Sequence, residues 1–291
     1  MRHIPFVQLD VFTQRPLEGN QLAVFPDAGS LTGDDMQALA RETNFSETTF
    51  IIPRGGDVEG RAGVRVRIFT VQQELPFAGH PTLGTAWFLH RQRKVDRVTL
   101  DLGVGPVTVE FGADGAGVMT QKDPVFGATH DRRDVAPLGG LSVDDLRDDL
   151  PVQAVSTGLP FVVVPVRTAQ ALRRMKLDAT RTDAYLAAAE AKFLYWIALD
   201  GGGRDGVDAQ ARMVFYGGED PATGSAAGCG ISHLVHHGAV PSGKTITILQ
   251  GLDVKRPSLV RTSAERVMDA VSRVRVGGHV VEVARGEYAV P

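Results

Sequence analysis

The sequence contains an internal repeat, in which landmarks of the first half return in the same order in the second half. The first half opens with FVQLDVF and the second with PVQAVST. An apolar run follows Gly19 (QLAVF) and Gly158 (LPFVVV), and much later come AGHPTLGTA from Ala78 and EDPATGSAA from Glu219. Because repeated landmarks at consistent spacing are typical of duplicated structural units, we expect two halves of similar fold, each with a central helix.

The hydrophobic pattern predicts many short strands with helices among them. Alternating or β-branched runs, broken by glycine and proline, occur at 6–12, 21–25, 48–52, 64–70, 97–102, 106–111, 152–156, 160–166, 193–199, 211–216, 245–249, 258–262 and 272–284. Helical periodicity is clearest at 33–43, 82–92, 168–175, 180–190 and 223–237. This mixture indicates an α/β or α+β chain with mixed sheets.

Composition excludes several classes of protein. The 291 residues favour two domains, and 43% hydrophobic with 22% charged residues is close to the average for a globular protein. The net charge is −3 and the basic residues are scattered, so the sequence predicts no positively charged surface that would bind nucleic acid. No apolar run approaches the ~20 residues that cross a bilayer, and the N-terminus alternates like a strand. We therefore expect a cytoplasmic protein with a small-molecule substrate and no membrane association.

Two segments predict helix N-termini that can attract an anion. In EDPATGSAAG, Asp220 is placed to cap a helix whose first turn includes Thr223, Gly224 and Ser225. In AGHPTLGTA, His80 is in the capping position before a proline. If the repeat reflects a pseudo-twofold arrangement, both N-termini would point into one cleft and suit a substrate carboxylate. The simpler alternatives are that Asp220 only caps its helix and that His80 only supports a turn.

A third segment, NFSETTFII, sets Glu47 just before an apolar strand. Asn44, Ser46 and Thr48 are candidate hydrogen-bonding neighbours. The simplest interpretation is a solvated strand end. A carboxylate walled by apolar side chains would instead have its pKa raised toward neutrality, as a general acid/base requires. The segment alone leaves both interpretations open.

Together these segments resemble the phenazine-biosynthesis PhzF-like isomerases, which have the diaminopimelate-epimerase fold. The resemblance spans nearly the whole chain and rests on PLEGNQLAVF from Pro16, NFSETTF from Asn44, RIFT and ELPFAGHPTLGTA between Arg67 and Ala86, GEDPATGSAAG from Gly218, and ILQGLDVKRPSLV from Ile248. It implies two pseudo-symmetric epimerase-like domains, each a curved β-sheet or barrel around a central helix. The expected domains are 1–126 with 279–291, and 127–278, with the active site at the cleft between them.

The resemblance also implies roles for individual residues. Glu47 would be the proton-shuttling acid/base, with His80 and Asp220 as further catalytic groups. The implied substrate-binding residues are Asn20, Ser46, Gly79, Thr223, Gly224 and Ser225. Epimerases of this fold have cysteine thiols where Gly79 and Asp220 stand here, so thiol-based epimerisation is not expected. The implied reaction moves a proton between carbons of a small cyclic carboxylate, in a homodimeric enzyme.

The sequence offers no sign of a metal or cofactor site. His233, His236 and His237 lack accompanying ligands at a recognised spacing, and we interpret them as a partly solvated helix face. No phosphate-binding glycine loop opens a helix. The lone Cys229 can form no intrachain disulfide and is interpreted as a small core residue. We therefore expect activity without a cofactor.

Three positions depart from the commoner family pattern. Gln21 and Val71 replace prolines, which we expect to alter turns, and Lys255 replaces a glycine. None of the three is a proposed catalytic group. Two alternatives remain: an isomerase or epimerase of the same fold acting on an unidentified amino-acid-like substrate, and a non-catalytic ligand-binding protein.

Overall fold

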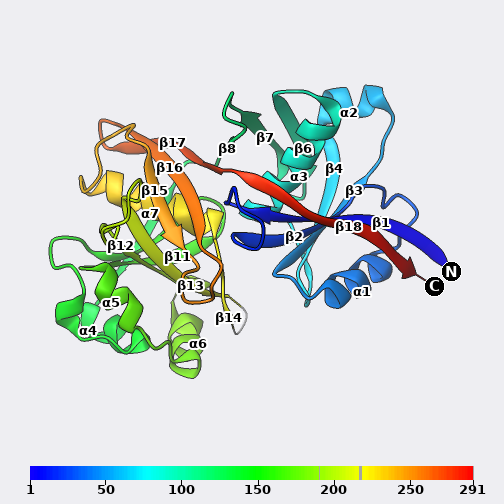
Figure 1. Ribbon diagram of the computed structural model, residues 1–291. Coiled ribbons are helices and arrows are strands. Elements are labelled where there is room, and N and C mark those ends of the chain that lie inside the picture. Colours follow the sequence, from blue (N-terminus) through cyan, green and yellow to red (C-terminus); the bar gives the residue numbers. More distant parts are fainter. Residues whose placement is uncertain (190, 216–217, 291) are drawn as a thin grey trace. The chain divides into compact units, whose positions relative to one another are not determined.

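The computed structural model describes residues 1–189, 191–215 and 218–290, and the chain divides into two compact units. Unit 1 comprises Met1–Thr120 with Gly277–Pro291, and unit 2 comprises Gln121–Val276. In Figure 1, unit 1 contains the blue and cyan elements with the red strand β18, and unit 2 runs from green to orange. The boundaries expected from the sequence, after residues 126 and 278, lie a few residues beyond these points.

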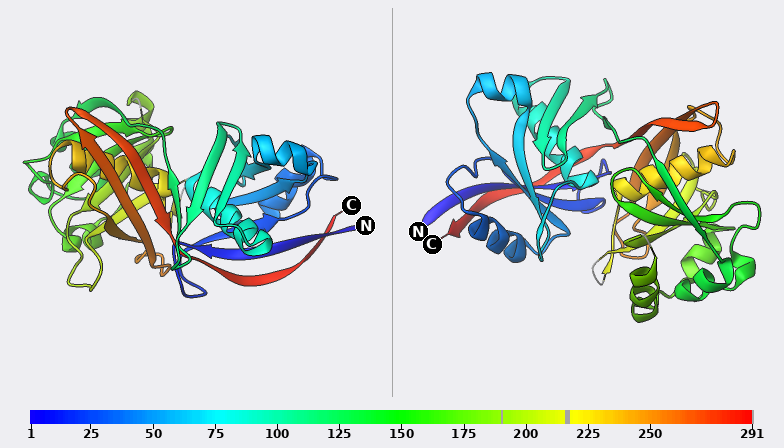
Figure 2. Two further views of the ribbon diagram at one scale, coloured as in Figure 1. Left: turned by 90° about the horizontal axis from the view of Figure 1, so that it is seen from above. Right: turned by 180° about the vertical axis from the view of Figure 1, so that it is seen from behind.

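Unit 1 is a mixed sheet with the order β18-β1-β2-β3-β4-β6-β7-β8. The pairs β2/β3 and β4/β6 are parallel and the others antiparallel. Its strands are β1 (Arg2–Val11), β2 (Asn20–Phe25), β3 (Glu47–Ile52), β4 (Val64–Phe69), β5 (Glu74–Leu75), β6 (Arg97–Leu102), β7 (Gly105–Phe111), β8 (Gly117–Thr120) and β18 (Val280–Val290). Its helices are α1 (Gly33–Thr43), α2 (Gly56–Ala62) and α3 (Gly79–Arg93). The views in Figure 2 show β18 running beside β1, so the last strand completes this unit.

Unit 2 repeats the mixed sheet, with the order β9-β10-β11-β12-β13-β15-β16. Its strands are β9 (Val125–His130), β10 (Val152–Ser156), β11 (Pro160–Val166), β12 (Phe193–Ala198), β13 (Ala209–Phe215), β14 (Gly218–Glu219), β15 (Ile246–Gln250), β16 (Ser258–Val267) and β17 (Ala270–Gly278). Its helices are α4 (Arg132–Val135), α5 (Ala169–Arg174), α6 (Ala179–Ala188) and α7 (Gly224–His236), with short 3₁₀ turns at Ala136–Gly139 and Val143–Asp145.

The strand pairings confirm the internal repeat. In unit 1, β1 pairs antiparallel with β2, β2 parallel with β3, β3 antiparallel with β4, and β4 parallel with β6 after α3. In unit 2, β10, β11, β12, β13 and β15 pair in the same succession, with α7 in the place of α3. The mixed α/β architecture of two pseudo-symmetric halves is therefore as expected from the sequence.

Small residues let each central helix lie close to its surrounding strands. Helix α3 packs against strands that include β1, β2 and β6, and α7 against β10, β11 and β16. A Cβ atom at Gly84 would lie 2.5 Å from Leu22 Cδ2, and one at Gly230 would lie 2.8 Å from Tyr195 Cε1. Since real Cβ atoms do not approach so closely, glycine is required where these helices face the sheets.

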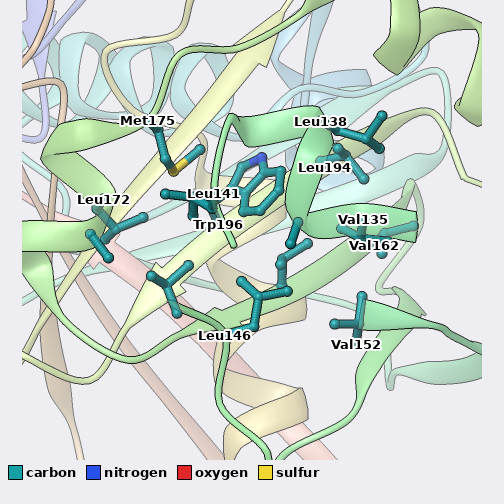
Figure 3. Packing of buried hydrophobic residues seen from close by; sticks show 14 of the residues in the cluster. Val135, Leu138, Leu141, Leu146, Val152, Val162, Leu172, Met175, Leu194 and Trp196 are labelled. Atoms are coloured by element: carbon teal, nitrogen blue, oxygen red, sulfur yellow. The ribbon is translucent and has the colours of Figure 1, made fainter. Parts of the chain in front are cut away.

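Each unit also has its own hydrophobic core. In unit 1 the rings of Phe25 and Phe50 stack with centroids 4.9 Å apart, beneath α1. In unit 2 the buried indole of Trp196 lies among the apolar side chains labelled in Figure 3, which come from α4, α5, the neighbouring strands and the turns between these elements. Burial of large side chains supplies the main driving force for folding, so each unit has what a stable domain requires.

Several expected element boundaries differ from the structure. The single strand expected at 272–284 is two strands, β17 and β18, separated at His279. Strands β8 and β9 and helix α2 were not expected, because their short segments lack a clear period. The ends of the expected elements 180–190 and 211–216 fall at residues 190 and 216, outside the described residues.

The departures from the family pattern have different local consequences. Gln21 lies inside β2, opposite Asp10, so the expected turn at this position is wrong. Val71 does lie in the bend after β4. Lys255 has φ +58°, a left-handed conformation that glycine adopts without the steric cost of a Cβ atom. The lysine is therefore accommodated with some backbone strain.

Candidate active site

Three elements of unit 1 bring Asn20, Glu47 and His80 together. Asn20 begins β2, Glu47 begins the parallel neighbour β3, and His80 lies in the first turn of α3. Their exposed fractions are 1%, 6% and 4%. Glu47 is therefore buried, and its interpretation as a solvated strand end is wrong.

The hydrogen bonds of His80 define its protonation state. Burial lowers the pKa of His80 to about 3, so the imidazole is neutral at physiological pH. Its Nε2 atom lies 3.2 Å from the carbonyl oxygen of Gln21, which can only accept, so Nε2 carries the proton. Nδ1 is then a lone-pair acceptor, and the side-chain amide of Asn20 donates to it at 3.3 Å.

Glu47 lies beside this fixed imidazole. Its Oε2 atom is 3.6 Å from Nδ1 of His80, and because the ring is uncharged this contact is not an ion pair. Both nitrogens of His80 already have partners, through Gln21 and Asn20. The arrangement places a buried carboxyl against a neutral ring that has no further proton to offer on that side.

The start of α3 differs from the sequence expectation. The helix begins at Gly79 and its N-cap residue is Ala78, so His80 is inside the first turn and is not the cap. Ala78 is extended, with φ −149° and ψ 145°, and its carbonyl oxygen accepts from both the backbone and the hydroxyl of Thr82. Because the chain turns helical before the proline, the histidine side chain is directed into the buried cluster instead of to the helix end.

In unit 2, a second cluster surrounds the start of α7. Asp220, Thr223 and Gly224 are buried, and Ser225 is partly exposed. The Thr223 hydroxyl and Oδ2 of Asp220 are 2.5 Å apart. The helix begins at Gly224 with Thr223 as its N-cap residue, so the expectation that Asp220 caps the helix is wrong. Thr223 has φ −119° and ψ 89°, which delays the helix until after the Asp220 turn.

The remaining predicted residues lie close to these two clusters in the chain. Ser46 is half-buried in the bend immediately before Glu47, and Gly79 is the buried first residue of α3. Asn44 ends α1 in a left-handed conformation with φ 53° and is exposed, so it serves as a helix cap. The Thr48 hydroxyl pairs with the Thr43 hydroxyl at 2.8 Å.

Sequence reasoning missed Gln250, which contacts both Asp220 and Thr223 from the end of β15. Its segment ILQGLDV was noted as a family landmark, but a glutamine ending an apolar strand carries no sign of its partners. Only the pairing of β15 beside β13 brings it to the start of α7.

Cys229 behaves as the small core residue expected. It is fully buried on α7, and burial raises the pKa of its thiol to about 11, so it is protonated at neutral pH. Its sulfur lies 3.6 Å from the Thr157 hydroxyl. A protonated, buried thiol is not available as a base.

The histidines of α7 form no metal centre within residues 1–189, 191–215 and 218–290, where no group of three or more ligating side chains was found. His233 is fully buried, with Nε2 2.9 Å from the carbonyl oxygen of Pro151. The expected solvated face is therefore wrong for His233, although His236 and His237 are partly exposed. Among the described residues, no helix is long and apolar enough to cross a membrane.

The buried histidines predict a loss of stability in mild acid. Burial lowers the pKa of His80 and of His233 to about 3, whereas 6.5 is the ordinary value. Below pH 6.5 the unfolded chain therefore binds protons that the folded chain does not, and each histidine lowers the free energy of unfolding by up to roughly 1.4 kcal/mol per pH unit. Above pH 6.5 both states are neutral and the two rings do not change the free energy of unfolding, and their destabilising effect accumulates as the pH falls from 6.5 toward 3.

Urea unfolding between pH 8 and pH 5 measures this slope. We expect His233→Asn to reduce it, and the exposed His3→Asn to leave it unchanged. Carboxylates with a lowered pKa, such as Glu74, change the free energy of unfolding mainly below pH 5. They therefore contribute little to the slope measured between pH 8 and pH 5. A free energy of unfolding that is constant from pH 7 to pH 5 would contradict the neutral state assigned to both rings.

The chain is similar to known proteins over nearly its whole length. Residues 9–286 match the model of a family described as Phenazine biosynthesis-like protein. A trans-2,3-dihydro-3-hydroxyanthranilate isomerase from Pseudomonas chlororaphis is 37% identical, with 97% of this chain and 98% of that protein covered. A crystal structure of a PhzF-family protein from Bacillus anthracis matches with TM-score 0.88 and 25% identity over all of both chains. A structure described as a predicted epimerase from Pseudomonas aeruginosa matches with TM-score 0.82 and 38% identity, over 99% of this chain and 100% of that one.

Proposed function

This chain belongs to the phenazine biosynthesis-like protein family, and we propose that it isomerises trans-2,3-dihydro-3-hydroxyanthranilate or a closely related small cyclic carboxylate. Three relatives that are 34–37% identical over 97% of the chain are named trans-2,3-dihydro-3-hydroxyanthranilate isomerase. The observation that carries the proposal is the buried carboxyl of Glu47 beside a neutral, hydrogen-bonded His80.

Glu47 is the proposed proton carrier. As a carboxylate, Glu47 removes a proton from one carbon of the substrate, and the electron pair of the broken C–H bond shifts through the conjugated ring. The protonated Glu47 then delivers a proton to another carbon, where the shifted electron pair forms the new C–H bond. No electrons are gained or lost overall, so one carboxyl suffices for both steps. His80 is a poorer candidate for the base, because both its nitrogens are engaged by Gln21 and Asn20. Its proposed role is to pack against Glu47 and to shield it from water.

The residues around α7 are proposed to bind the substrate. The first-turn N–H groups of Gly224 and Ser225 belong to a helix of 13 residues, whose N-terminus favours a carboxylate. Asp220 is proposed to accept a hydrogen bond from a hydroxyl or amino group of the substrate. Asn20, Ser46 and Gly79 remain proposed contacts in unit 1.

We further propose that the enzyme acts in the cytoplasm as a homodimer. Both assignments rest on the resemblance to the PhzF-like isomerases. Light scattering of the purified protein measures the assembly directly, with a mass of twice the 31.2 kDa chain expected.

Incubation of the pure protein with trans-2,3-dihydro-3-hydroxyanthranilate tests the proposed function. We expect conversion followed by ultraviolet absorbance and proton NMR, without added metal or nucleotide and unaffected by exhaustive chelation. Loss of turnover on metal removal, restored by one divalent ion, would overturn the cofactor-free mechanism. Absence of conversion would reject this substrate, and a panel of amino acids in solvent deuterium would then test the amino-acid-like alternative.

A further inference from the structure

We propose that Gln250 is a positioning residue, which holds Asp220 and Thr223 in the geometry that the reaction requires. Its effect on turnover rests on the proposed function, whereas its effect on the local structure does not. Gln250 is the last residue of β15 and is 1% exposed.

The side-chain amide of Gln250 makes three contacts with the turn before α7. Its Nε2 atom donates to the carbonyl oxygen of Asp220 at 2.9 Å and to the hydroxyl oxygen of Thr223 at 3.0 Å. Its Oε1 atom accepts from the backbone N–H of Thr223 at 3.4 Å. A single side chain thus spans the turn from its first residue to the N-cap of α7.

The backbone partners of the Gln250 amide allow only one of its two flipped orientations. A carbonyl oxygen can only accept and a backbone N–H can only donate, so Nε2 must face Asp220 and Oε1 must face the N–H of Thr223. The Thr223 hydroxyl then receives a hydrogen from Gln250, and its own hydrogen is directed to Oδ2 of Asp220. A relay of donors therefore runs from Gln250 through Thr223 to the Asp220 carboxylate.

A glycine next to Gln250 allows this approach. Gly251 has φ +81°, and a Cβ atom there would lie 2.6 Å from the carbonyl oxygen of Pro221 and 2.3 Å from that of Arg256. Only glycine fits such a position without displacing the backbone. The end of β15 is consequently held against the Asp220 turn, and the amide of Gln250 has little freedom to move elsewhere.

The isosteric change Gln250→Glu replaces the donor at Nε2 by an acceptor and preserves the shape of the side chain. A carboxylate oxygen at the position of Nε2 would face the Asp220 carbonyl and the Thr223 hydroxyl oxygen with no hydrogen to donate. The buried groups left unsatisfied would push the turn away. Gln250→Met, of similar length, removes the hydrogen bonds but adds no repelling charge.

We expect Gln250→Glu to lower kcat/KM by roughly 10²-fold at pH 8, since displacements of about 1 Å in a catalytic array cost this much. Gln250→Met should lose less. The deficit of Gln250→Glu should shrink as the pH falls, because protonation of the introduced carboxylate restores one donor. In a Thr223→Val background, Gln250→Glu should cost less than in the wild type, since one of the two contacts made by Nε2 is already lost.

Hydrogen exchange of the peptide spanning Asp220 to Ala227, measured without substrate, tests the effect of Gln250 on local structure independently of turnover. We expect faster exchange in Gln250→Glu and Gln250→Met, and no change in Gln210→Glu. Gln210 is the matched control, because it is also buried in unit 2 but donates to the Gly201 carbonyl instead.

The two arms separate failure of this inference from failure of the proposed function. If the wild-type protein does not convert the substrate but the exchange pattern is as expected, the substrate assignment fails and the positioning role stands. If the wild-type protein is active and Gln250→Glu matches it in kcat, KM and exchange, the positioning role is rejected. If Gln250→Glu and Gln210→Glu lose activity and exchange protection equally, the effect is a general destabilisation of unit 2, and the positioning role is also rejected.

Discussion

Glu47→Gln is expected to lower kcat by ~10²–10⁴-fold, the range that general acid/base catalysis contributes, while substrate affinity changes little. Glutamine has nearly the same shape and can hydrogen-bond, but it cannot exchange a proton at accessible pH. The side chain is buried at the start of β3, and its Oε2 is 3.6 Å from His80 Nδ1. The amide preserves the size of the side chain and buries no charge, so folding should be preserved.

Steady-state kinetics with the substrate, together with ligand binding by calorimetry, separates these effects. Glu42→Gln, an exposed glutamate on α1, is the matched control and should retain wild-type turnover. In solvent deuterium, a shuttling carboxyl that exchanges with water leaves label at the carbon that receives the proton, and a sealed site shows partial internal transfer. Turnover near that of the wild type in Glu47→Gln would falsify the assignment and leave Asp220 or His80 as the base.

The elements with strong local patterns could be predicted from the sequence. Helix α1 at Gly33–Thr43 and strands β10 and β11 lie where the periodicity placed them, because apolar spacing and flanking turn residues act within the segment itself. The repeat was equally visible, since duplicated landmarks predict duplicated pairings. What is local in the chain was therefore accessible without a structure.

The features that define the site depend on contacts between distant segments. Glu47 is buried because β3 pairs with β2 and because α3 brings His80 beside it, and neither contact leaves a trace in NFSETTF. The state of His80 depends on the Gln21 carbonyl, 59 positions away in the chain. Likewise, the turn conformation at Thr223 delays α7, so an aspartate that fits the N-cap pattern lies outside the helix.

Asp220→Asn is expected to raise KM and to lower kcat together, with a combined loss of roughly 10²–10³-fold in kcat/KM, as for removal of one preorganised polar group that contacts the reacting molecule. Asparagine preserves the size of the side chain, and its Oδ1 can still accept from the Thr223 hydroxyl. What it loses is the negative charge that would hold a substrate hydroxyl or amino group. Because Gln250 already donates to Thr223, the turn retains its hydrogen bonds and the protein should fold.

The same kinetic and calorimetric measurements test this change, with thermal unfolding to verify that the fold is intact. Asp183→Asn, on the exposed face of α6, is the matched control and should leave both parameters at their wild-type values. The expected pattern differs from that of Glu47→Gln, where affinity survives and turnover does not, so the pair of variants separates binding from proton transfer. If Asp220→Asn keeps wild-type kcat/KM, the start of α7 is not the substrate-binding part of the enzyme. If it instead lowers kcat alone as far as Glu47→Gln does, Asp220 shares the proton transfer, and the division of roles between the two carboxyls must be redrawn.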